Sequence, residues 1–277
     1  MALTITTNVA SLNAQRSLTG SQHAMDQSLA RLSSGFRINQ AADDAAGLAI
    51  SENLKAQIRG LGQANRNSND GISLVQVAEG GLNEISNMLI RLRELGVQAS
   101  SDTIGDTERK FIDVEYQQLK SEVQRVSEVT SFNGCDLLNG TGGVLDVQVG
   151  VHNDPFKDRI SFNTAAADST MAALGLTAES VGTKVQAQNS LDVVDNAMVS
   201  VNAMRANFGA MQNRLQSTIN NLMVAHENLS AANSRIRDTD VAAESAELTR
   251  NTILKQAGVS MLSQANQTQQ IALKLLG

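Results

Sequence analysis

Few residues in this chain have the types and spacing that chemistry requires. Asp43 and Asp44 are adjacent acids that could share a proton, but we expect a turn or helix-cap contact instead. Cys135 is the only cysteine, and we expect it to be a small buried residue beside a turn. The three histidines lie far apart in the sequence, without paired ligands: His23, His152 and His226. The sequence therefore predicts no catalytic residue, no cofactor and no metal site.

The composition instead favours long helices with an aliphatic core. The 277 residues are 42% hydrophobic, yet they include only 6 Phe, 1 Tyr and no Trp. A single proline is present, and proline is the residue that interrupts helix interiors. Long uninterrupted helices are therefore expected.

The charge pattern excludes two classes of partner. The formal net charge is −6, and residues 101–160 hold 11 acids against 6 bases. No basic stripe is available for phosphates, so nucleic acid is not expected as a partner. No apolar run approaches the roughly 18 residues that span a membrane, so membrane insertion is not expected. Residues 1–25 lack the pattern of a signal peptide, so we expect any export to use another route.

A seven-residue repeat dominates the C-terminal half. Its apolar members are Val194, Val201, Phe208, Leu215, Leu222, Leu229 and Ile236. Six unbroken heptad steps predict one long helix that packs in coiled-coil fashion.

The N-terminal half supplies helices that could pair with it. Leu18, Met25 and Leu32 repeat by seven, and another helix is predicted over about 107–129. A narrow apolar stripe must be buried against another helix, so an antiparallel bundle of the two halves is the simplest arrangement.

The periodicity changes between the helical halves. Apolar residues alternate with polar ones over 145–151, and residues 159–163 can pair with them as a second strand. The predicted fold is mainly α, a long antiparallel helical rod with coiled-coil packing and a small β-hairpin region inserted at one end. The two ends of the chain, rich in Ala, Ser, Asn and Gln, are expected to be weakly ordered alone and to fold on assembly.

Several segments resemble bacterial flagellin. They include residues 8–14 (NVASLNA), 32–39 (LSSGFRIN), 41–50 (AADDAAGLAI), 132–134 (FNG) and 257–266 (AGVSMLSQAN). The resemblance implies a D0 domain of residues 1–43 and 236–277, whose paired helices line an inner tube. It implies a D1 rod of residues 44–235, with a short β-rich variable segment over 130–185 and no large outer domains.

The same resemblance implies the function and the partners. Flagellins leave the cell through the flagellar type III apparatus and polymerise into a hollow extracellular filament that serves swimming motility. The implied partners are further copies of the chain, an export chaperone, the filament cap and the hook–filament junction proteins. We expect the filament contacts to include Leu12, Leu29, Leu32, Leu254, Met261 and Leu275.

A receptor surface is also implied. Residues 91–98 (RLRELGVQ) resemble the segment by which many flagellins engage the animal innate receptor TLR5. The corresponding candidates are Arg91, Glu94, Leu95, Gln98 and Glu115. Arg91 and Leu95 are four residues apart, so we expect a cation beside an apolar anchor on one helix face.

Two other classes of protein compete with this interpretation. A minor flagellar assembly protein, such as a hook–filament junction adaptor, shares the terminal helices of flagellin. An enzyme would need a pocket with convergent polar groups, and the sequence has neither a phosphate-binding glycine loop nor a nucleophile elbow. We therefore expect a structural subunit and no enzyme.

Overall fold

The computed structural model describes residues 7–274, with side chains over residues 7–267. The chain divides into two compact units, one of residues 1–56 and 228–277 and the other of residues 57–227. Helices α2 (Ala45–Ala99) and α4 (Lys184–Arg237) each contribute residues to both units. We call the unit of residues 1–56 and 228–277 the terminal unit, and the unit of residues 57–227 the central unit.

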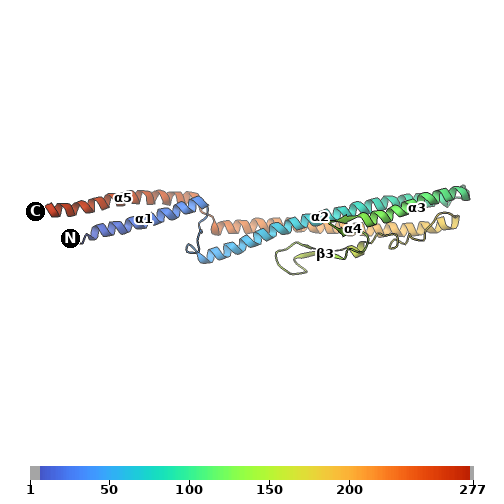
Figure 1. Cartoon of the computed structure of the whole chain (residues 1–277), viewed down its shortest axis with the longest axis horizontal. Coiled ribbons are helices and arrows are strands. Elements are labelled where there is room, and N and C mark those ends of the chain that lie inside the picture. Colours follow the sequence, from blue (N-terminus) through green and yellow to red (C-terminus); the bar gives the residue numbers. More distant parts are fainter. Residues whose placement is uncertain (1–6, 275–277) are drawn as a thin grey trace. The chain divides into compact units, whose positions relative to one another are not determined.

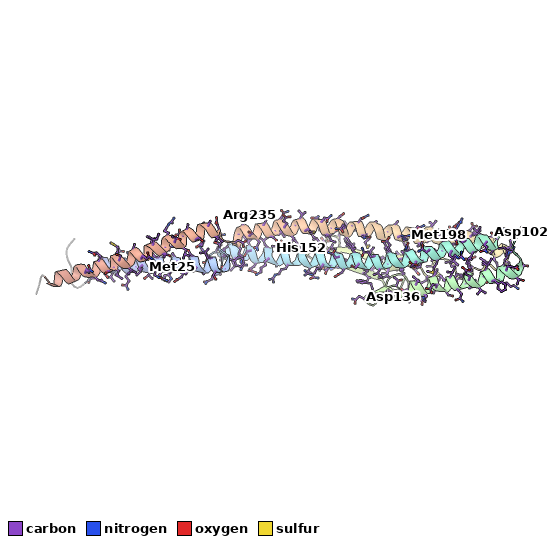
Figure 2. The ribbon with its side chains drawn as sticks, turned by 90° about the horizontal axis from the view of Figure 1, so that it is seen from above. Met25, Asp102, Asp136, His152, Met198 and Arg235 are labelled. Atoms are coloured by element: carbon purple, nitrogen blue, oxygen red, sulfur yellow. The ribbon has the colours of Figure 1, made fainter. Side chains whose placement is uncertain are left out.

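Three helices build the central unit. Parts of α2 and α4 lie beside α3 (Asp106–Val129), as Figure 1 shows. A turn joins α2 to α3, and Asp102 lies in it (Figure 2). The predicted helix over about 107–129 and the predicted mainly helical fold are therefore confirmed.

The predicted heptad repeat forms the core of the central unit. Val194, Val201 and Phe208 are buried on α4, in one cluster with a row of α2 side chains, and Leu215 is buried in a second cluster with Val149 and Ile160. That row consists of Val75, Ala78, Leu82, Ile85, Leu89 and Leu92. The repeat continues into the terminal unit, but there Leu229 and Ile236 are only half-buried. The same seven-residue spacing thus makes a closed core in one unit and an open face in the other.

Four short strands and a 3-10 turn connect α3 to α4. Strands β1 (Ser131–Phe132) and β2 (Cys135–Asp136) form a two-residue hairpin, and Cys135 is exposed in it. Our expectation that Cys135 is buried was wrong, because it directly follows the exposed turn formed by Asn133 and Gly134.

The second hairpin confirms the predicted strands. Strand β3 (Val144–Gln148) pairs antiparallel with β4 (Arg159–Asn163), which leads into η1 (Thr164–Ala167). Ile160 and Phe162 are buried, and Phe162 packs against Phe208 with ring centroids 5.3 Å apart.

Glycines of α2 make room for this β region along the side of the helix. A Cβ at Gly81 would lie 2.7 Å from Thr130 Oγ1 and 2.8 Å from Leu138 Cδ1. A Cβ at Gly60 would overlap Val151 just beyond β3. Side chains at these positions would therefore push the β region off the helix.

The only tyrosine of the chain offers a spectroscopic test of this core. Burial raises the pKa of Tyr116 to about 12, and this effect outweighs the lowering by the neighbouring Ser190 hydroxyl. The unfolded phenol titrates near 10, so the folded state keeps its proton over a range in which the unfolded chain loses it. We expect the free energy of unfolding to fall as the pH rises from about 10 to about 12, and this fall to disappear in Tyr116→Phe. Tyrosinate absorbance of the folded chain checks the pKa directly, and a midpoint near 10 would contradict the burial.

Candidate assembly surface

The terminal unit is built on two paired helices, α1 (Val9–Ser34) and α5 (Val241–Lys274), which run side by side in Figure 1. The Asn8 side chain begins α1 by accepting a hydrogen bond from Ser11 N at 3.0 Å. Gly35 ends it with a positive φ of 76°, and Asp240 begins α5 by accepting from Ala242 N at 2.9 Å. Caps that the sequence encodes therefore define both ends of α1 and the start of α5.

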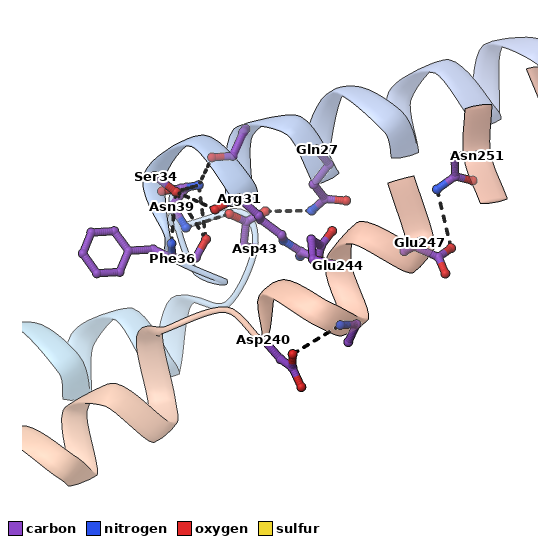
Figure 3. Close-up of polar contacts among 12 residues, drawn as sticks. Gln27, Arg31, Ser34, Phe36, Asn39, Asp43, Asp240, Glu244, Glu247 and Asn251 are labelled. Atoms are coloured by element: carbon purple, nitrogen blue, oxygen red, sulfur yellow. Dashed lines mark hydrogen bonds and ion pairs between the residues drawn. The ribbon is translucent and has the colours of Figure 1, made fainter. Parts of the chain in front are cut away.

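The seam between α1 and α5 combines small and polar residues with apolar ones such as Leu18 and Met25. On α5 the seam includes a seven-residue repeat of Glu244, Asn251, Gly258 and Ala265. Each of these residues is buried or contacts α1 or its N-cap residue. Glu244 lies 3.6 Å from Arg31, Asn251 is 5% exposed, a Cβ on Gly258 would touch Leu18, and Ala265 O accepts from Asn8 at 3.0 Å. Figure 3 shows the Arg31 end of this seam and Asn251, which lies near Glu247.

A polar network holds the loop that follows α1. The Asp43 carboxylate accepts from Asn39 N and Gln40 N, both at 3.0 Å, and from the Gln27 side chain (Figure 3). Hydrogen bonds from these backbone amides lower the pKa of Asp43. Asp44 accepts from Gly47 N at 2.8 Å at the start of α2. The predicted turn and cap roles of the acid pair are therefore confirmed.

A second set of contacts fixes the joint between α4 and α5. Arg237 forms an ion pair with Glu52, and its guanidinium lies 4.8 Å from the centre of the Phe36 ring. The Arg37 side chain donates to Ile236 O at 2.6 Å, and Thr239 N donates to Gly35 O at 3.0 Å. The joint is therefore held by polar contacts.

Several large apolar side chains of the terminal unit are exposed. Among its described side chains, Ile38 is the only hydrophobic one that is buried. Of the predicted filament contacts, Leu12 is 57% exposed, Leu29 47%, Leu254 49% and Met261 63%. Leu32 is half-buried, and Leu275 lies outside the described residues. A unit that exposes this much apolar surface and buries so little is typical of an association site.

The exposed apolar residues surround α5 on several sides. Leu254 and Met261 are one heptad apart and share a flank of the helix. Val241 and Val259 lie about 140° around the helix from Leu254 at 3.6 residues per turn, and Ile253 lies on a third side. A helix that is apolar on several sides is typical of one that is covered from several directions.

The predicted receptor residues are only partly brought together. Arg91 donates to Glu115 Oε1 at 2.8 Å across α2 and α3, and to Glu94 Oε2 at 3.0 Å. Its guanidinium pKa is raised by these carboxylates, first by Glu115. Gln98 is exposed on the same helix. Leu95, however, is 1% exposed and belongs to the core, so its prediction as an exposed apolar anchor was wrong. Residues four apart differ by about 40° around a helix, and that turn is enough to bury Leu95 while Arg91 stays outside.

Sequence reasoning missed a polar row on α3. Asp113, Gln117, Lys120 and Gln124 lie at spacings of four, three and four, and each bonds the segment 171–181. Asp113 Oδ1 accepts from Val181 N at 2.8 Å, and Lys120 Nζ donates to Glu179 O at 2.6 Å. Gln117 donates to Glu179 O at 3.1 Å, and Gln124 accepts from Met171 N at 2.9 Å. The helical spacing of these side chains was the available signal.

Neither a metal-binding cluster nor a membrane-spanning helix is found among the described residues. Its His, Cys, Asp and Glu side chains form no group of three or more that could hold a metal ion. No helix within it is both long enough and apolar enough to cross a membrane.

Comparison with known proteins decides the family. Residues 5–142 match the family described as the bacterial flagellin N-terminal helical region, and residues 191–276 match its C-terminal helical region. The chain belongs to the bacterial flagellin family. This is a family of structural proteins, so the chain is not an enzyme, as predicted.

The relatives match nearly the whole chain. A flagellin of Halalkalibacterium halodurans is 45% identical over 97% of this chain and 98% of its own length. A flagellin of Bacillus subtilis is 43% identical, and the flagellar filament core protein flaB2 of Brachyspira hyodysenteriae is 42% identical. The alignment with the B. subtilis flagellin covers 97% of this chain and 98% of that flagellin. The alignment with flaB2 covers 98% of this chain and 99% of flaB2.

Solved structures agree with this assignment. The crystal structure of Bacillus cereus flagellin is similar with a TM-score of 0.51 and 31% identity, over 61% of this chain and 94% of that one. A putative flagellar hook-associated protein from Vibrio parahaemolyticus has a TM-score of 0.58 at 15% identity, over 71% and 100% of the two chains. At that identity, the second likeness concerns the fold alone.

Proposed function

We propose that this flagellin is the self-polymerising structural subunit of an extracellular flagellar filament. The observation that carries the proposal is the exposure of Leu12, Leu29, Leu254 and Met261 on the terminal unit. Burial of these side chains between copies would remove from water the apolar surface that the isolated unit leaves open.

The distribution of that surface favours an open polymer over a closed dimer. A two-fold dimer covers one patch on each copy, whereas α5 carries apolar side chains on several sides. Heterologous contacts that use different sides of the same helix continue from copy to copy and generate a helical assembly. In this proposal residues 1–43 and 236–277 form the inner D0 layer, and residues 44–235 form the outer D1 rod.

Family membership supports the remaining parts of the proposal. The subunit would be secreted by the flagellar type III apparatus, and the hollow filament would serve swimming motility. Its partners would be further copies of the chain, an export chaperone, the filament cap and the hook–filament junction proteins. Several relatives are named flagellar filament core proteins, and the chain spans nearly their whole length.

The alternative is a junction adaptor, which shares the fold of the terminal helices. The two functions differ in copy number, because a filament subunit is made in thousands of copies and an adaptor in a few tens. Quantitative mass spectrometry of isolated flagella would separate them.

Seeded polymerisation tests the main proposal. The full-length chain and a variant that lacks residues 242–277 are each mixed with short filament fragments and imaged by electron microscopy. The intact chain is expected to extend the fragments and the truncated chain to stay soluble. An intact chain that does not extend them favours the adaptor, and growth of the truncated chain would overturn the assigned role of α5.

We also propose that the free subunit is recognised by TLR5 through Arg91, Glu94, Gln98 and Glu115. The observation that favours this surface is the Arg91–Glu115 pair, which displays exposed charges across α2 and α3. Arg91→Glu is expected to weaken binding of the monomer to the receptor ectodomain at least tenfold, because it reverses the charge at the centre of the patch. Unchanged binding would overturn this part of the proposal.

A further inference from the structure

The methionines of this chain differ sharply in their access to solvent. Among those with described side chains, Met261 is 63% exposed and Met223 is 57% exposed. The others are half-buried: Met25, Met88, Met171, Met198, Met204 and Met211. Exposure sets how readily a thioether is oxidised, so a peroxide would react first at Met261 and Met223.

These two side chains lie in different surroundings. Met261 follows Leu254 by one heptad on the apolar flank of α5. Met223 lies on α4 in the central unit, beside a groove lined by Leu61 and Gly62. The pair therefore offers the same chemistry and nearly the same exposure at two separate surfaces.

We propose that Met261 is a peroxide-sensitive modification site that controls polymerisation of the free subunit. This inference rests on the proposed function and adds a form of regulation to the same surface. In the reaction the sulfur lone pair attacks one oxygen of hydrogen peroxide, and the O–O bond breaks as the S–O bond forms. The thioether is oxidised to the sulfoxide, and the peroxide is reduced to water after proton transfer.

The sulfoxide changes what α5 offers to a neighbouring copy. It replaces a flexible apolar side chain with a polar one on the flank that carries Leu254. Burial of that polar group in an apolar contact raises the critical concentration for polymerisation by about tenfold or more. Within a filament the thioether is covered, so oxidation acts on free subunits and spares assembled ones.

The test uses four full-length chains that all carry Cys135→Ser, because the exposed Cys135 thiol also reacts with peroxide. They are the otherwise unchanged chain, Met261→Leu, Met223→Leu and Met261→Gln, the last as a polar substitute of similar size. Each is treated with hydrogen peroxide or left untreated, the oxidised positions are assigned by peptide mass spectrometry, and the critical concentration is measured by sedimentation of seeded reactions.

The expected result separates the two methionines. Peroxide raises the critical concentration of the unchanged chain and of Met223→Leu about tenfold, whereas Met261→Leu keeps its untreated value. Met261→Gln is impaired without peroxide, and in preformed filaments Met261 is oxidised at least tenfold more slowly than in free subunits.

Other outcomes overturn the inference. Normal polymerisation of a chain in which Met261 is shown to be oxidised would contradict it, as would rescue by Met223→Leu but not by Met261→Leu. Both results leave the proposed function intact. A chain that fails to extend seeds before any peroxide is added would overturn the proposed function and this inference together.

Discussion

Leu254→Asp is expected to abolish filament growth while the subunit stays folded. Leu254 is 49% exposed in the free chain, so a carboxylate at this position remains in contact with water and costs the monomer little. In a filament the same carboxylate would enter an apolar contact, where an unpaired charge costs several kcal/mol. A cost of about 4 kcal/mol corresponds to roughly a thousandfold rise in the critical concentration.

Sedimentation of seeded reactions measures this rise, and circular dichroism checks that the variant keeps its helices. Leu254→Met is the matched control, because it preserves volume and polarity and should polymerise nearly as the unchanged chain does. Normal growth of Leu254→Asp would show that this flank of α5 faces solvent in the polymer.

Lys120→Met is expected to lower the free energy of unfolding of the central unit by about 2–4 kcal/mol. Lys120 is 4% exposed and donates to Glu179 O at 2.6 Å and to Thr177 O at 3.2 Å. Burial lowers its pKa, so the ammonium group depends on these two carbonyls for the hydrogen bonds it would otherwise make with water. Methionine fills similar space but leaves Thr177 O without this donor, which costs about 1–3 kcal/mol. Glu179 O keeps its bond from Gln117 and loses only the net contribution of a charged donor, about 1 kcal/mol.

Denaturant unfolding followed by circular dichroism measures the loss. Lys110→Met on the exposed side of α3 removes the same charge, and its effect should stay within about 0.5 kcal/mol. Equal losses in the two variants would mean that the segment 171–181 is not held by Lys120.

The seven-residue pattern predicted the helices because burial along a coiled-coil seam repeats at that interval. Val194, Val201, Phe208 and Leu215 are buried as that pattern requires. The alternation over 145–151 likewise predicted β3, since one face of the strand must be covered.

Spacing alone did not predict which way each helix faces. Arg91 and Leu95 are four residues apart, but only the contacts of α2 with its neighbours decide that Leu95 enters the core. The polar row with Asp113 and Lys120 has the sequence pattern of a solvated helix face. It forms internal hydrogen bonds only because the segment 171–181 packs across it. Long-range packing of this kind is not encoded in local periodicity.

Amide hydrogen exchange of the monomer and of the filament tests the central claim most directly, namely that the terminal unit gains its stability from assembly. In the monomer, α1 and α5 are expected to exchange much faster than the amides of α2 and α4 in the central unit, because Ile38 is the only buried hydrophobic side chain among the described residues of the terminal unit. In the filament, the amides of α1 and α5 should become as protected as those of the central unit. Equal protection of α1 and α5 in the free chain and in the filament would contradict the account.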